Sequence, residues 1–173
     1  MLQTGVIVQL LLALTLARGG AHPPRTVVDY YLLLPSKYFE GLATDTRSER
    51  MRLFRDFKGS FIDRQHGFLH IRGDGAQPDL NVCIFKRTDG TYLAAVNSNT
   101  DSDGQWDPFL DFYVYRAGHL VNFTRPMRPQ GLSRNLGFVL PRYGQTIKVV
   151  NENGRTLYGL HWTGMMFVKP AGR

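Results

Sequence analysis

The sequence contains a single cysteine, and no apolar run in it is long enough to cross a membrane. Cys83 has no partner for an intramolecular disulfide, so the fold must be stable without such a bond. The longest apolar run, Val6–Ala17, spans 12 residues, whereas a membrane-spanning helix needs about 20. These shortages exclude a disulfide-dense mini-protein and argue against a membrane-spanning helix.

The same apolar run has the length of the central region of a secretory signal, and small residues follow it. With Gly19 at −3 and Ala21 at −1, the sequence predicts cleavage after Ala21, and cleavage after Ala17 is the second choice. No Lys or Arg precedes the run, which leaves a short uncleaved anchor as the alternative. We therefore expect a signal peptide over residues 1–21, one globular domain over 22–173, and a secreted or periplasmic location with no membrane span after cleavage.

Motifs of catalysis are missing as well. The chain has no G-x-S-x-G, no phosphate-binding loop with a Lys-Ser/Thr pair, and no two histidines at metal-binding spacing on one predicted element. Cys83 lies in the most apolar predicted strand, where a buried neutral thiol is inert, so we interpret it as a core residue. These absences favour a protein that is not an enzyme, without deciding the question.

The chain does contain many turn signals between apolar segments, which predict β-hairpins. Asp89–Gly90 predicts a hairpin that pairs Cys83 with Val96, in a central strand buried on both faces. Ala117–Gly118 predicts another, with Val114 and Val121 on one face.

Two further hairpins are predicted near the C-terminus, and one near residue 67. Asn153–Gly154 would place Glu152 opposite Arg155, and Thr163–Gly164 would place Trp162 opposite Met165. A glycine with positive φ is expected at Gly67.

Helical patterns are confined to the N-terminal third. Arg47–Lys58 predicts a helix capped by Asp45 or Thr46, and the Asp29–Leu34 run favours a short helix over a strand. Residues 125–143, rich in Pro and Gly, predict a long irregular loop. The expected fold is therefore α+β, mainly antiparallel β as a hairpin meander, sheet or sandwich, with one or two short N-terminal helices.

An acidic loop resembles the first half of a calcium-binding loop. Asn99, Asp101 and Asp103 stand at positions 1, 3 and 5, which supply oxygen ligands, and Asp107 stands at position 9. The residue at position 12 is not Glu, and Asp111 comes one position too late. The alternatives are a Ca²⁺ site made by these five residues and a polar loop between two strands, with no cofactor.

Positive charge is in excess, with 21 Lys and Arg against 14 Asp and Glu and a net charge of +7. Five of these cations lie on the predicted helix: Arg47, Arg50, Arg52, Arg55 and Lys58. A second group follows in the predicted loop: Arg125, Arg128, Arg134 and Arg142. Because guanidinium groups suit phosphate and carboxylate, the helix group is our candidate site for an anionic ligand, and a solvated basic face is the alternative.

Three short segments, Leu160–Phe167, Asp29–Phe39 and Gly73–Gln77, together resemble an uncharacterised family of small secreted bacterial β-rich proteins. The first has the pattern Leu-x-Trp-x-Gly-x-x-Phe. The resemblance implies a secreted β-rich fold, and it implies no activity and no functional residue.

Taken together, these features predict a secreted or periplasmic binding or accessory domain whose ligand is anionic. Its partner would be an anionic envelope or extracellular polymer, and we expect no nucleic acid. The alternative is a hydrolase of a cell-wall or extracellular polymer with carboxylates assembled by the fold, drawn from Asp29, Asp63, Asp74 and Asp79 with His70.

Overall fold

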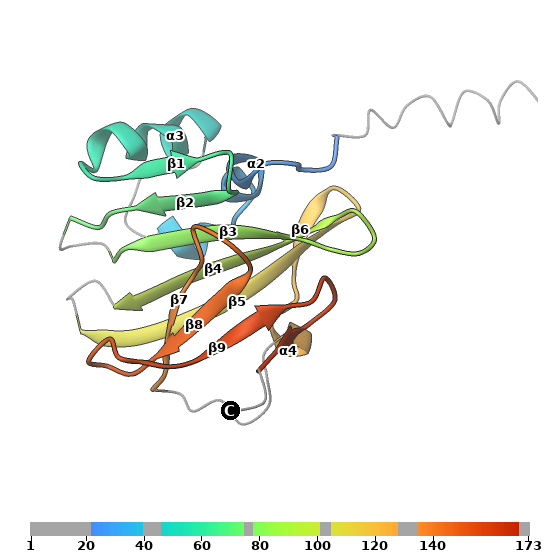
Figure 1. Cartoon of the computed structure of the whole chain (residues 1–173). Coiled ribbons are helices and arrows are strands. Elements are labelled where there is room, and N and C mark those ends of the chain that lie inside the picture. The colour runs from blue at the N-terminus through green and yellow to red at the C-terminus, as the bar shows by residue number, and fades with distance from the viewer. Residues whose placement is uncertain (1–21, 40–45, 75–77, 101–104, 128–134, 170–173) are drawn as a thin grey trace, which may run out of the picture.

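The computed structural model describes residues 22–39, 46–74, 78–100, 105–127 and 135–169. Within them, two antiparallel sheets pack face to face, and short helices cover the other face of the larger sheet (Figure 1). The predicted α+β class, mainly antiparallel β, is confirmed. The predicted signal peptide over residues 1–21 lies outside the described residues.

The larger sheet is a meander of six strands in the order β1-β2-β3-β4-β5-β6. Its strands are β1 (Phe61–Asp63), β2 (Phe68–Ile71), β3 (Leu80–Lys86), β4 (Tyr92–Thr100), β5 (Trp106–Arg116) and β6 (His119–Asn122). The smaller sheet has the order β10-β9-β8-β7. Its strands are β7 (Gly137–Val139), β8 (Thr146–Val150), β9 (Thr156–Trp162) and β10 (Phe167–Val168).

The helical elements are α2 (Val27–Leu32), the 3-10 helix η1 (Ser36–Phe39), α3 (Arg47–Asp56) and α4 (Thr124–Met127). Both predicted N-terminal helices are confirmed, and each begins with a capping box, made by Thr26 for α2 and by Thr46 for α3. Among the described residues, no helix is long and apolar enough to span a membrane.

The larger sheet is apolar on both faces. Val82 and Val96 belong to the core shared with α2, α3 and η1, whereas Cys83 and Phe85 belong to the core shared with the smaller sheet. The prediction of a central strand buried on both sides is confirmed for β3. Cys83 is a core residue, as predicted, and its thiol donates to the carbonyl of Pro141 at 3.4 Å.

The Ala117–Gly118 hairpin has the predicted register. Val114 pairs with Val121 and Arg116 with His119. Ala117 (φ 48°) and Gly118 (φ 93°) both adopt positive φ, as a two-residue type I′ turn requires. The predicted positive φ at Gly67 is confirmed as well, at 65°.

The predicted register at Asp89–Gly90 is wrong by one residue. Cys83 pairs with Ala95, not with Val96. Only Gly90 adopts positive φ there, and the amide of Arg87 donates to the carbonyl of Thr91. The connection is therefore a three-residue loop that ends in a left-handed glycine, which moves every pair by one position.

Two other hairpins also close differently from the prediction. Around Asn153–Gly154, a bulge after Val149 replaces the expected Glu152–Arg155 pair, although Val149 still faces Tyr158. At the last hairpin, Trp162 pairs with Phe167, not with Met165.

The predicted loop over residues 125–143 contains the edge strand β7, so that prediction is wrong in part. Gly137 lies under the indole of Trp106, and a Cβ on this glycine would be 2.3 Å from the ring. Such close contact excludes any larger residue, which explains why a glycine occupies this position of the strand.

Side-chain amides from β4 form hydrogen bonds with the backbone of β7, on the edge of β7 that does not pair with β8. Asn99 accepts from the amide of Phe138 (2.8 Å) and donates to the carbonyl of the same residue (2.9 Å). Asn97, which is 1% exposed, donates to the same carbonyl at 2.7 Å. These bonds attach the smaller sheet to the middle of the larger one.

We expect the Asn99→Ala substitution to destabilise the protein by about 1–3 kcal/mol, because it leaves the buried amide of Phe138 without an acceptor. Urea unfolding measures the effect, with Glu152→Ala on an exposed turn as the control. Equal free energies of unfolding for the two variants would show that Asn99 does not hold β7.

Candidate functional site

A cavity of about 490 Å³ lies between the segment that precedes α2, α2 itself, the start of α3 and the β5–β6 turn. Its lining residues include three that carry or can carry positive charge, His22, Arg25 and Arg47, and one carboxylate, Asp29. The rest of the lining is Pro23, Pro24, Leu32, Leu33, Tyr115 and Gly118.

The carboxylate of Asp29 is already used to start α2. Its Oδ2 accepts from the amide of Thr26 (3.0 Å), the hydroxyl of Thr26 (2.8 Å) and the amide of Arg25 (3.2 Å). Partial burial opposes ionisation of Asp29, but these hydrogen bonds and the nearby Arg47 outweigh it and lower the pKa. The guanidinium groups of Arg25 and Arg47 are both on exposed residues at the cavity.

The predicted anion-binding residues, on α3 and just after it, divide into two groups. Arg47, Arg52, Arg55 and Lys58 are exposed, and Arg52 pairs with Asp56 at 3.2 Å. Arg50 turns inward. Its Nη1 donates to the carbonyls of Leu32 (3.0 Å) and Leu34 (2.7 Å), and its guanidinium lies over the ring of Phe39. Arg50 therefore joins α3 to the end of α2, while the other four cations face solvent.

The three candidate calcium ligands that lie in the described residues are not brought together. Asn99 faces β7, and Asp111 lies on the other face of the larger sheet, against η1. Asp107 is exposed on β5, and Asp101 and Asp103 lie outside the described residues. Within the described ranges, no group of three or more His, Cys, Asp or Glu residues is placed to hold a metal ion.

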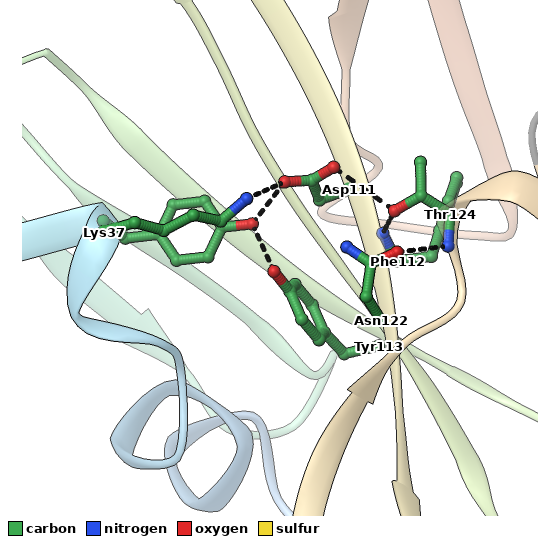
Figure 2. Close-up of polar contacts among 7 residues, drawn as sticks. Lys37, Asp111, Phe112, Tyr113, Asn122 and Thr124 are labelled. Atoms are coloured by element: carbon green, nitrogen blue, oxygen red, sulfur yellow. Dashed lines mark hydrogen bonds and ion pairs between the residues drawn. The ribbon is translucent and has the colours of Figure 1, made fainter.

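Asp111 instead organises a polar network between η1 and β5 (Figure 2). Its Oδ2 accepts from Nζ of Lys37 (2.7 Å) and from the hydroxyl of Tyr38 (2.5 Å), and its Oδ1 accepts from the hydroxyl of Thr124 (3.2 Å). The hydroxyls of Tyr38 and Tyr113 are 2.8 Å apart. Because Tyr38 donates to the carboxylate, Tyr113 is the donor in that contact.

The ionisation of this network is fixed by its contacts. Burial opposes the charged form of Asp111, but the hydrogen bonds from Lys37 and Tyr38 outweigh it and lower the pKa of the carboxyl. Burial and the bond to Asp111 raise the pKa of Tyr38 far above its ordinary value. A neutral tyrosine and a satisfied carboxylate are poor acids and bases, and we interpret the network as the anchor that holds η1 on β5.

The candidate residues of the hydrolase alternative lie at three places in the fold, and Asp74 is exposed directly after Gly73. Asp29 lies at the cavity, and Asp79 accepts from the amide of Gly73 at 2.7 Å. Asp63 and His70 lie on the paired strands β1 and β2. His70 is the direct cross-strand partner of Phe61, and Asp63 lies two residues after Phe61 on the same strand.

No family model and no curated protein matches the chain. A solved structure shares its fold. It is a domain of an uncharacterised protein from Porphyromonas gingivalis W83, with a TM-score of 0.57 and 14% sequence identity. The match covers 84% of this chain and 98% of that domain. At this identity the likeness shows the fold alone, and it agrees with the predicted resemblance only in that the neighbour, too, is uncharacterised.

The sequence analysis named Arg47 but not Arg25 and His22, which line the same cavity. Their signal is weak, because the segment before α2 has no periodicity that places it against a helix. A second group, Asp63, His66, Arg142 and Tyr143, was also missed, because the β7–β8 loop brings it together across 79 positions.

We expect Asp111→Asn to destabilise the protein by about 1–3 kcal/mol at pH 7, mainly through the bonds from Tyr38 and Thr124, since Lys37 is half exposed and its ion pair is screened. The pKa of Asp111 is lowered in the folded state, so its contribution is full above the unfolded value of about 3.9 and is lost as the pH falls through the folded value. The difference between wild type and variant should therefore shrink at acid pH.

Urea unfolding at pH 7 and at low pH measures this difference. Asp107→Asn, an exposed carboxylate on the same strand, is the control and should match wild type when chelator is present. A constant difference across the pH range would contradict the assignment.

Three candidate Ca²⁺ ligands remain, Asp101, Asp103 and Asp107, and their binding of Ca²⁺ can be tested directly. If the loop binds Ca²⁺, a tenfold to hundredfold excess over Kd stabilises the fold by about 1.4–2.7 kcal/mol, and chelator reverses the effect. Thermal melting with millimolar Ca²⁺ and then with EDTA checks it. An unchanged Tm would reject the site.

Proposed function

We propose that the protein is a secreted or periplasmic binding domain for an anionic ligand, with the cavity between Arg25 and Arg47 as its site. The observation that carries the proposal is that Arg25, Arg47 and His22 all line one cavity of about 490 Å³. Among the described residues, Asp29 is the one carboxylate that lines it, and its Oδ2 is satisfied by the start of α2.

The lining suits an anion attached to an organic body. Guanidinium groups present planar pairs of N–H donors that match carboxylate, sulfate or phosphate oxygens. Leu32, Leu33 and Tyr115 supply the apolar part of the wall. Ligand sites are usually lined by apolar side chains with a few polar groups among them.

The positive surface continues from the cavity along α3. Arg47 begins this helix of 10 residues, and Arg52 and Arg55 are exposed further along it. A helix of this length spans about 15 Å. A polymer with repeated negative charges could therefore contact the cavity and the helix together, whereas a small anion would use the cavity alone. This supports an anionic envelope or extracellular polymer as the partner.

The test is binding of two anionic polymers, polygalacturonate and dextran sulfate, with neutral dextran as the comparison. The Arg25→Gln/Arg47→Gln double variant should weaken binding at low salt by about tenfold or more, and reduce the dependence of log K on log salt by about two charges. Isothermal titration calorimetry at several salt concentrations measures both quantities.

Arg155→Gln, which removes an exposed arginine on the β8–β9 turn, is the matched control and should bind as wild type. Arg52→Gln/Arg55→Gln should weaken binding of the polymers but leave binding of free galacturonate unchanged. If the cavity variant binds both polymers like the control, the proposal is wrong.

A further inference from the structure

A second cluster lies far from the cavity, where the β7–β8 loop meets the edge strand β1. We call Phe61, Asp63, His66, Arg142 and Tyr143 the Arg142 cluster. Arg142 and Tyr143 come from the loop, and the other three come from β1 and the β1–β2 turn. The cluster joins the two sheets through side chains alone.

Asp63 holds the cluster together. Its carboxylate, in a side chain that is 10% exposed, accepts from Nε of Arg142 (2.8 Å) and from Nδ1 of His66 (3.0 Å). The hydrogen bond from Arg142, followed by those from His66, lowers the pKa of Asp63 to about 2. Since an ionised carboxylate only accepts, Nδ1 of His66 carries the proton. In neutral imidazole this leaves the lone pair on Nε2.

Two hydrogen-bonding groups of the cluster stay available. Among the described residues, Nε2 of His66 and the Nη groups of Arg142 have no hydrogen-bond partner. Neutral His66 offers an acceptor, and Arg142 offers donors. Their common attachment to Asp63 fixes the two groups relative to each other.

The cluster also exposes aromatic surface. Tyr143 is 64% exposed and Phe61 is 37% exposed, and they are the only aromatic residues among the large exposed hydrophobic side chains of the described chain. The guanidinium of Arg142 lies over both rings, 4.9 Å from the centre of Phe61 and 5.3 Å from that of Tyr143. The imidazole of His66 meets Tyr143 edge to face at 4.7 Å. These contacts hold an exposed ring in place before any ligand arrives.

We propose that the Arg142 cluster is a saccharide-binding platform, with Tyr143 as the surface against which a sugar ring packs. A sugar has an apolar face of C–H groups and a rim of hydroxyls that donate and accept. The cluster offers the complement of each part: an exposed ring, the acceptor of His66 and the donors of Arg142. An apolar ligand would leave both polar groups unpaired.

The neighbouring surface extends the polar rim. Phe61 lies 5.6 Å from the ring of His70, and Nδ1 of His70 is 2.8 Å from Oδ1 of Asn81. His70 and Asn81 are direct cross-strand partners, on the same face as Phe61. A chain of sugar units could therefore continue from Tyr143 across β1 and β2 towards β3.

The test uses neutral oligosaccharides, cellohexaose, chitohexaose and mannohexaose, so that the arginines of the cavity add no charge attraction. We expect at least one of them, at millimolar concentration, to shift the backbone amide resonances of residues 61–66 and 142–144 in ¹H–¹⁵N NMR spectra. Tyr143→Ala should weaken that binding by about tenfold. Arg142→Lys keeps the charge but loses the planar fork, and should weaken it as well.

Met165→Ala removes a side chain of nearly equal exposure, 63%, at the β9–β10 turn and should bind as wild type. The cavity variant Arg25→Gln/Arg47→Gln should also retain binding, which separates this proposal from the proposed function. If none of the three oligosaccharides shifts these resonances, or if Tyr143→Ala binds as Met165→Ala does, the platform is rejected.

Discussion

The whole structure depends on one sheet that is apolar on both faces. The central strands β3 and β4 alternate between two hydrophobic cores, so neither face can be left to water. The N-terminal segment folds into α2, η1 and α3 to cover one face, and the C-terminal third folds into a second sheet to cover the other (Figure 1). Each covering layer leaves a boundary where it ends, and both candidate sites lie at such boundaries.

Polar contacts decide how each layer is aligned on the sheet, because hydrophobic packing is not directional. Lys37 and Tyr38 attach η1 to Asp111 on one face. On the other, Asn99 attaches β7, and the indole of Trp162 donates to the carbonyl of Lys86 at 2.7 Å. The same rule explains Arg50, whose guanidinium donates to the carbonyls at the end of α2.

The sequence was sufficient for the fold class, the two capped helices and the doubly buried strand, because these follow from local patterns. The registers of the hairpins were harder to predict. The register was right at Ala117–Gly118, where both residues adopt positive φ, and wrong at Asp89–Gly90, where only the glycine does. The difference between a two-residue and a three-residue loop lies in backbone angles that the residue types permit but do not impose.

The candidate sites were the hardest to predict from the sequence, because contacts between residues far apart in the chain form them. A charge run on a helix predicted Arg47 as a ligand residue, but it could not show that Arg25 lines the same cavity. The calcium pattern placed Asn99 and Asp111 in one loop motif. In the fold, Asn99 lies on β4 and Asp111 on β5, and their side chains are on opposite faces of the larger sheet. Residues that are close in the sequence can therefore be far apart in the folded chain, and residues that are far apart in the sequence can be in contact.

The side-chain amide of Asn99 has one more consequence. An edge strand normally exposes backbone groups that can pair with a strand of another molecule, which is a common start of aggregation. In β7 the N–H and C=O of Phe138, the central residue of this three-residue strand, are already taken by Asn99. A second chain therefore finds no free pair of groups at that position, and β7 is a poor template for intermolecular sheet growth.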